Sequence, residues 1–285
     1  METDSIQEKL LYKQVKKMPL IELLKQKNKP PKGRTHVIIE SPSQDILSFC
    51  SEDYKLRKNS TIYKPFEKLL KENNIPFRKQ IIVVDGNKFY VDYIVYKQLK
   101  SKLLGDVIPR LSIWNSYDGT VKTHIHFGYH RLLCGNGLSR PVGCQIKLSS
   151  KHSTDEKVFS KETVPYFLQL FKSFLKESGS DIKIFEKMQR KKVPAAFLDK
   201  IADKLKFSKE ARDMAFDQLN KEISGGLHYI NEKGEQVIST QSPITMFAVY
   251  NALNYAIYHT NPKELPEFKS KRDKALIELC LVCKD

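Results

Sequence analysis

The sequence lacks the long apolar segments that membrane insertion or secretion would need. It has no apolar run of about 18 residues, the length that a transmembrane helix requires, so we expect no membrane partner. The first residues, Met1-Glu2-Thr3-Asp4, are polar, and no apolar signal core follows them. Its five cysteines are sparse and odd in number, which fits a reducing compartment better than a disulfide framework. We therefore expect a cytoplasmic protein.

Motifs of the common hydrolases are also missing. The sequence has no HExxH zinc motif, no DxD pair of carboxylates and no ExK nuclease pattern on paired strands. Gly135-Asn136-Gly137 allows a tight turn but lacks the Lys-Ser/Thr ending of a phosphate-binding loop. Cys134 has only His130 nearby as a base. We therefore predict no catalytic residues, no cofactor and no tightly bound metal.

Positive charge is the most informative property of the composition. Lysine and arginine number 49 against 33 acidic residues, which gives a net charge of +16 and a pI near 9.4. Such an excess favours a polyanionic partner. An AT-rich genome also raises the lysine content without any binding role, so charge alone does not prove the partner. Hydrophobic residues make up 40% of the chain, which is enough for a packed core.

Strand signals dominate the chain between residues 36 and 150. Asp85-Gly86-Asn87 separates two apolar runs, as in a tight hairpin, and residues 121–129 alternate between apolar and polar side chains. We expect one helix in this part, over residues 62–73. The predicted strands cover residues 37–39, 46–49, 80–84, 88–96, 109–114 and 121–129.

Helical periodicity dominates after residue 150, with Ser208 as a predicted N-cap and Pro243 as a predicted first helical residue. The predicted helices cover residues 163–177, 182–188, 195–205, 209–223, 244–258 and 271–282. Residues 230–241 predict a small hairpin. Near the N-terminus, apolar residues over 5–27 recur at helical spacing and precede a basic linker. The sequence thus predicts an α+β protein with a helical arm and linker (1–35), an antiparallel β-rich domain (36–150) and a helical domain (151–285).

Three histidines, His124, His126 and His130, lie close together in the most regular strand pattern. In an extended strand His124 and His126 project on the same side, about 7 Å apart, a spacing that metal sites use. A third ligand would have to come from His130 or His152. We leave three interpretations open: a structural or solvated face, a nucleic-acid surface, or the centre of a metal-dependent enzyme.

The pair Cys280 and Cys283 provides at most half of a zinc site. On a helix both thiols share an apolar face with Leu276 and Leu279. We therefore expect buried thiols there.

Basic stretches and tyrosines supply the candidate nucleic-acid contacts. Lysines flank the strand that carries Tyr90, Tyr93 and Tyr96, and a stacked base contributes about 1–3 kcal/mol in single-strand binding. Another basic run is Arg190-Lys191-Lys192. The candidate nucleic-acid-binding residues are Lys55, Arg57, Lys58, Tyr90, Tyr93, Tyr96, Lys97, Lys100, Lys102, Lys122, His124, His126, Arg131, Arg190, Lys191 and Lys192.

Three segments resemble a known family. Asn115-Ser116-Tyr117-Asp118-Gly119-Thr120, followed by Arg131, Cys134, Asn136 and Leu138, resembles the signature N-S-x-D-G-[ST] … R-x-x-C-x-N-[GT]-L. That signature is typical of the phage/plasmid-like proteins catalogued as domain of unknown function 932. Residues 47–58 with Asn59, and the helix that contains Tyr250-Asn251-Ala252, are similar to further parts of this family, although Asn254 stands where the family often has threonine. The resemblance spans most of residues 45–260 and implies a phage, prophage or plasmid origin, but no chemistry.

The leading hypothesis is a non-enzymatic DNA-binding protein of a phage or mobile element that acts in the host-cell cytoplasm and binds or anneals single strands. The alternatives are a factor that inhibits a host defence complex, with a defence protein as its partner, and the metal-dependent enzyme around the histidines. The oligomeric state stays open. Among the signature residues we expect Asn115, Asp118, Gly119, Arg131 and Asn136 to meet at one end of the sheet, with Arg131 clamping Asp118.

Overall fold

The computed structural model describes residues 2–20, 33–41, 43–95, 99–101, 105–131, 136–138, 148–150, 164–194, 196–224, 227–230, 236–239, 244–261 and 263–282. The described helices are α1 (Glu2–Leu11), α3 (Asn59–Glu72), α4 (Val164–Arg190), α5 (Ala196–Lys204), α6 (Lys209–Ser224), α7 (Met246–His259) and α8 (Pro266–Val282). None of them is both long and apolar enough to cross a membrane.

The strands form three sheets. β1 (Gln14–Pro19), β2 (His36–Ser41) and β3 (Ile46–Cys50) make a three-stranded antiparallel sheet. The largest sheet has the order β10-β8-β7-β5-β4, with β6 paired to β7 and β9 paired to β8. Its members are β4 (Phe77–Val84), β5 (Lys88–Val95), β6 (Leu99–Ser101), β7 (Gly105–Ser116), β8 (Thr123–Arg131), β9 (Asn136–Leu138) and β10 (Leu148–Ser150). The third is a hairpin of β11 (Leu227–Ile230) and β12 (Gln236–Ser239).

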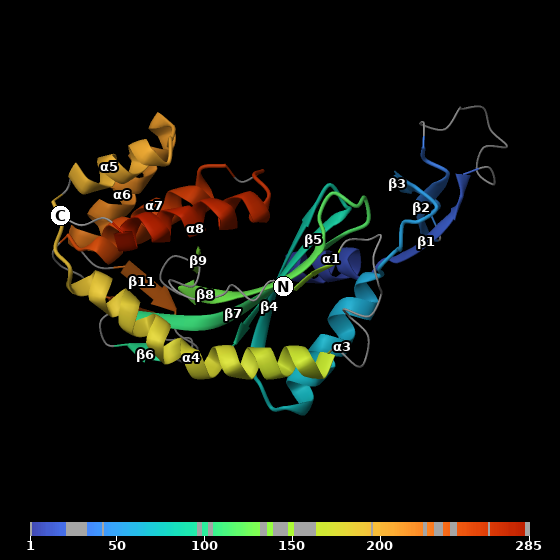
Figure 1. The fold of residues 1–285 in the computed structure, drawn as a ribbon, viewed down its shortest axis with the longest axis horizontal. Helices are drawn as coiled ribbons and strands as arrows, with labels where there is room; N and C mark the ends of the chain where they lie inside the picture. The colour runs from blue at the N-terminus through green and yellow to red at the C-terminus, as the bar shows by residue number, and fades with distance from the viewer. Residues whose placement is uncertain are drawn as a thin grey trace. The chain divides into compact units, whose positions relative to one another are not determined.

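These elements confirm the α+β class. The large sheet and α3 occupy the N-terminal half, and helices dominate the C-terminal half (Figure 1). The chain divides into two compact units of interleaved segments. Unit 1 contains residues 1–93, 111–126 and 146–172, and unit 2 contains residues 94–110, 127–145 and 173–285. The predicted domain boundaries at residues 35 and 150 stay a prediction.

In unit 1 the core forms between α3 and the sheet. Phe66 of α3 contacts the ring of Tyr93 edge-on at 5.1 Å, and Phe77 contacts the same ring at 5.4 Å. The Tyr93 hydroxyl donates to the carboxylate of Glu67, at 3.1 Å. This residue is therefore an amphipathic core side chain whose one polar atom is satisfied inside the unit.

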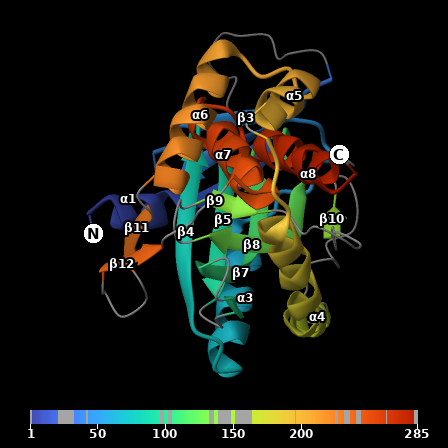
Figure 2. The same ribbon diagram turned by 90° about the vertical axis from the view of Figure 1, so that its left-hand side faces the viewer.

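In unit 2 the helices α5, α6, α7 and α8 pack together (Figure 2). The family-like residues of α7 serve as buried polar links in this bundle. Tyr250 donates to Asp273 of α8 at 2.9 Å, and the Asn251 amide donates to Glu222 of α6. Asn254 donates to the same Asp273 carboxylate at 2.7 Å. Because a buried carboxylate needs such partners, these amides stabilise the contacts of α7 with its neighbours.

Several boundaries differ from the sequence predictions. Of the one or two helices expected over residues 5–27, α1 ends at Leu11, and residues 14–19 form β1 because they pair with β2. The two helices expected over 163–188 are one continuous helix, α4, which passes through Gly179. Thr245, rather than a residue beside Pro243, caps α7, because its hydroxyl accepts from the Ala248 amide at 3.1 Å.

Two local predictions in unit 2 are confirmed. Ser208 caps α6, since its hydroxyl accepts the Ala211 amide at 3.2 Å. The hairpin expected over residues 230–241 appears as β11 and β12.

Candidate nucleic-acid interface

Residues 54–59, which lead into the start of α3, are held against the large sheet by a buried hydrogen-bond relay. The side-chain amide of Asn115 donates to the Arg57 carbonyl at 3.1 Å and to Asn59 Oδ1 at 2.8 Å. Its oxygen accepts the Thr123 hydroxyl at 2.9 Å, and Thr123 in turn accepts Arg57 Nη1 at 3.2 Å. Asn115 thus uses both of its amide hydrogens and its oxygen to hold this segment in place.

The turn between β7 and β8 contains the rest of the Asn-Ser-x-Asp-Gly-Thr motif. Asp118 accepts the Thr120 amide at 2.9 Å and the Thr120 hydroxyl at 2.6 Å. Gly119 has φ +72°, and a Cβ there would lie 3.1 Å from the ring of Tyr54. Glycine is therefore required both by the backbone conformation and by the close approach of Tyr54.

The positive charge of Lys88 neutralises the carboxylate of Asp118 in this turn. Its Nζ lies 3.3 Å from Asp118 Oδ2 and 3.1 Å from Asp85 Oδ2. Partial burial opposes ionisation of Asp118, but the hydrogen bonds from Thr120 and the Lys88 charge hold the pKa of this carboxyl below its usual value. The carboxylate that Arg131 was expected to clamp is therefore paired with Lys88.

Around the relay, three of the predicted cationic residues are exposed and one is not. Lys55, Lys58 and Lys122 are exposed, and the Arg57–Thr123 contact brings the segments that carry them to the same end of the sheet. We call these three residues the lysine rim. Arg57 itself is only 6% exposed and points inward, so the prediction that it contacts phosphate is wrong for this conformation.

The predicted stacking tyrosines are buried. Tyr90 is 2% exposed and packs edge-on against Trp114 at 5.7 Å, while Tyr93 is fully buried in the α3 contact. Neither ring offers a face to a base, so the stacking role that we predicted for them is wrong. The reason is that both faces of β5 are covered. Tyr96, Lys97 and Lys102 lie outside the described residues, and of Lys100 only the backbone, in β6, is described.

Two histidines of β8, His124 and His126, belong to an aromatic cluster. The ring of Trp114 stacks on His124 at 5.1 Å and meets His126 edge-on at 4.8 Å, and the two imidazoles lie 5.9 Å apart. On neighbouring strands Ser112 donates a hydrogen bond to Asp92. Among the described residues no group of three His, Cys, Asp or Glu side chains could hold a metal ion. His124 is half-exposed and His126 is buried, so His124 is the better placed of the two for a ligand.

Basic residues at the end of α4 form the other predicted cluster, in unit 2. Arg190 and Lys192 are exposed, and Lys191 is half-buried. The backbone is held in place because the Lys191 carbonyl accepts the Met246 amide at 2.8 Å. The cluster is thus a surface feature on an ordered backbone.

The second half of the family-like signature lies at the other end of β8. Arg131 pairs through its backbone with Asn136 of β9. Cys134 lies outside the described residues, and nothing is described of the Arg131 and Asn136 side chains. Of the two cysteines near the C-terminus, Cys280 is buried as expected, and Cys283 lies outside the described residues.

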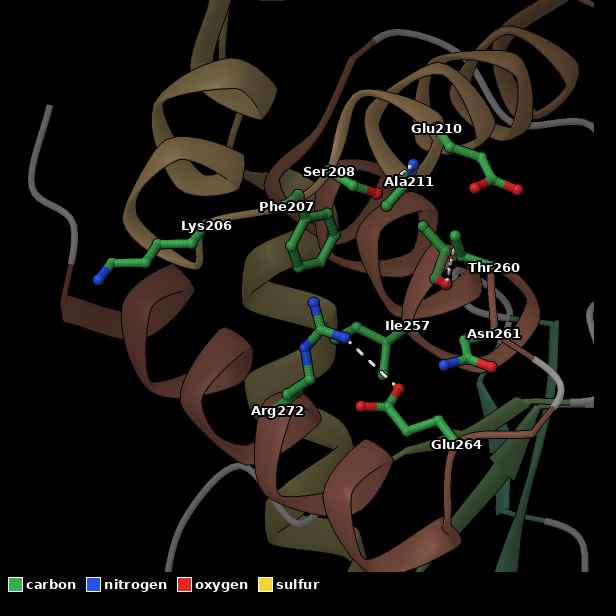
Figure 3. Close-up of a pocket in the computed structure, with 11 residues that line it drawn as sticks. Lys206, Phe207, Ser208, Glu210, Ala211, Ile257, Thr260, Asn261, Glu264 and Arg272 are labelled. Atoms are coloured by element: carbon green, nitrogen blue, oxygen red, sulfur yellow. Dashed lines mark hydrogen bonds and ion pairs between the residues drawn. The ribbon is translucent and has the colours of Figure 1, made fainter.

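A pocket of about 390 Å³ opens beside the start of α6 in unit 2 (Figure 3). The Arg272 guanidinium lies 5.2 Å from the Phe207 ring centre and 3.4 Å from Glu264. Ser208 is occupied as the α6 cap, and the Thr260 hydroxyl donates to the Ala256 carbonyl at 2.8 Å. Four polar side chains of this pocket, those of Ser208, Thr260, Glu264 and Arg272, are therefore already used within the protein.

Sequence reasoning missed the roles of two residues in the relay. Asn59 lies in the segment that resembles the family, but its amide donates to the Leu11 carbonyl at 2.8 Å, which no local pattern indicates. Thr123 is one polar residue in an alternating strand. Asn59 and Thr123 differ from ordinary polar side chains only because the fold brings distant segments of the chain against them.

Comparison with known families agrees with the signature. The family model described as Domain of unknown function (DUF932) matches residues 46–277, which include the relay, the β7–β8 turn and the polar links of α7. No curated protein and no solved structure matches the chain. Because the match covers most of the sequence, this chain belongs to the DUF932 family.

Proposed function

We propose that this protein binds DNA, chiefly through phosphate contacts, and that it does so in the life cycle of a phage or other mobile element. The observation that carries the proposal is the net charge of +16 on a folded chain. Cationic residues from separate predicted clusters, such as Lys58, Lys122, Arg190 and Lys192, are exposed. Surface lysine and arginine raise affinity for DNA by releasing condensed counterions.

The buried tyrosines change the expected mode of binding. Preference for single strands usually depends on exposed aromatic rings that stack with bases. Since Tyr90 and Tyr93 are in the core, phosphate contacts have to supply most of the affinity. We therefore expect weak sequence dependence and steep salt dependence, with single-strand preference or annealing left to measurement.

The lysine rim provides the first test. We would titrate fluorescent single-stranded and duplex DNA with the wild-type chain and with Lys55→Gln/Lys58→Gln/Lys122→Gln between 50 and 200 mM salt. The matched control replaces Lys9, Lys16 and Lys71, which are also exposed lysines of unit 1. Each lost phosphate contact lowers the slope of log affinity against log salt by about 0.9 on duplex DNA or about 0.7 on single strands.

We expect submicromolar wild-type binding at 50 mM salt and a shallower slope for the rim variant than for the control. Absence of wild-type binding would remove the proposal and leave inhibition of a host defence complex as the stronger alternative. Equal slopes for the two variants would remove the rim from the binding surface.

A further inference from the structure

Helix α4 carries a straight row of cations. At about 100° per residue, the side chains of Lys176, Lys183, Lys187 and Arg190 fall within a sector of about 60° on this helix. All four are exposed, and at about 1.5 Å per residue the row is about 21 Å long. We call these four residues the α4 stripe, after the helix labelled α4 in Figure 1.

Nothing acidic interrupts the stripe. Glu177 and Glu186 of the same helix fall outside its sector, and the positions between Lys176 and Lys183 near the sector are the small residues Gly179 and Ser180. None of the four stripe side chains forms a hydrogen bond or ion pair with any part of the chain that the structure describes. The charge of the stripe is therefore not neutralised there.

The opposite face of this helix is buried in unit 2. Phe174 and Phe185 are fully buried and Met188 nearly so. Phe174 stacks on Phe127 at 5.4 Å, and Asp181 accepts the Tyr129 hydroxyl at 2.5 Å. These contacts fix the rotation of the helix about its axis and leave the stripe facing outward.

We propose that the α4 stripe is a phosphate-binding track for nucleic acid, an inference that rests on the proposed function and assigns its strongest contact surface. A row of four cations without a carboxylate matches the regular charge of a phosphate backbone. A lipid surface is a poorer match, because a helix that lies on a membrane must present apolar residues to it. Along the stripe, Ile182, Phe185 and Met188 are buried and Ile184 is half-buried, so this part of α4 exposes no large apolar side chain.

The first experiment replaces the four stripe residues with glutamine and measures duplex DNA binding against salt. The control replaces Lys209, Lys221, Lys263 and Lys271, which are exposed elsewhere in unit 2. Both variants have a net charge of +12, that is +16 less four, so the general attraction is matched. We expect the stripe variant to lose about 3 to 4 from the salt slope and to bind more than about tenfold more weakly at 50 mM salt.

The second experiment changes one residue in the middle of the stripe. Gly179→Glu places a carboxylate between Lys176 and Lys183, and Gly179→Ala is its uncharged control. A Cβ at residue 179 would have nothing within 4 Å, so both side chains fit. We expect Gly179→Glu to weaken DNA binding severalfold at 50 mM salt and Gly179→Ala to leave it unchanged.

The outcomes separate the two proposals. If the wild-type chain does not bind DNA, the proposed function fails and the stripe fails with it. If the wild-type chain binds and the stripe and control variants have the same slope, DNA binding stands and the stripe is overturned. Equal slopes for the two variants are also the result expected if the partner of this helix is an acidic protein instead of DNA.

Discussion

At the scale of single residues, Asn115 is expected to contribute strongly to stability. Its amide joins the Arg57 carbonyl, Asn59 and Thr123 in the core of unit 1, and Asn115 is fully buried. Asn115→Ala leaves these partners unsatisfied, and each buried polar group without a partner costs about 1–3 kcal/mol. We expect a loss of about 2–4 kcal/mol in the free energy of unfolding, measured by urea denaturation. Gln80→Ala, at an exposed position on β4, should stay within about 0.5 kcal/mol of wild type.

Asp118 gives a pH-dependent prediction. Despite the opposing effect of partial burial, hydrogen bonds and Lys88 lower its folded-state pKa below the unfolded value of about 3.9. A depressed carboxyl pKa adds stability above the unfolded pKa, and that stability is lost as pH falls through the folded pKa. Asp118→Asn should therefore lower the urea midpoint more at pH 7 than at pH 3. An equal loss at both pH values would show that the carboxylate charge is not what stabilises the turn.

At the scale of elements, α4 contains an avoidable helix breaker. Gly179 lies inside a 27-residue helix, has no positive φ and has open space where a Cβ would be. Alanine at a compatible position reduces the entropy of the unfolded chain and favours the helix by about 0.5–1 kcal/mol. Gly179→Ala should raise the thermal midpoint by about 1–4 °C in a calorimetric scan. An unchanged or lower midpoint would mean that the helix has to bend or open at this residue.

Whether a segment is a helix or a strand could be predicted where the local sequence pattern favours the same structure as its packing in the folded chain. Period-two alternation predicted β8, and Asp85-Gly86-Asn87 predicted the β4–β5 connection. Of the one or two helices expected over residues 5–27, α1 is confirmed, but residues 14–19 are a strand, because apolar spacing there also suits a strand and pairing with β2 decides between them. Residues 21–27 lie outside the described residues. The split of α4 was wrong because packing of its aromatic face outweighs the cost of Gly179.

Of the candidate site, the sequence predicts only the residues of the Asn-Ser-x-Asp-Gly-Thr motif. Asn115, Asp118 and Gly119 are recognisable because the turn requires their side chains or backbone conformation. Which aromatic and basic side chains are exposed could not be predicted in the same way. Alternation assigns Tyr90 and Tyr93 to opposite faces of β5, and both faces are covered. Arg57 looks like any basic surface residue until β7 and β8 provide its partners.

At the scale of the whole molecule, the net charge of +16 acts on stability as well as on binding. Like charges repel more strongly in the compact state than in the unfolded chain, so a large net charge destabilises folding. Salt weakens that repulsion, because the screening length falls from about 30 Å at 0.01 M to about 8 Å at 0.15 M. It also weakens exposed ion pairs such as Lys68–Glu72 and Lys274–Glu278, but each of these contributes only about 0.3–0.5 kcal/mol.

Relief of repulsion should therefore prevail, and we expect the thermal midpoint to rise by a few degrees between 10 and 150 mM sodium chloride. At about 2–4 °C per kcal/mol, a shift of this size corresponds to about 1 kcal/mol. The glutamine variant of the α4 stripe, with its net charge of +12, should show a smaller rise, because less repulsion is left to screen. A midpoint that falls with added salt would mean that ion pairs, rather than net repulsion, dominate the electrostatics of the folded chain.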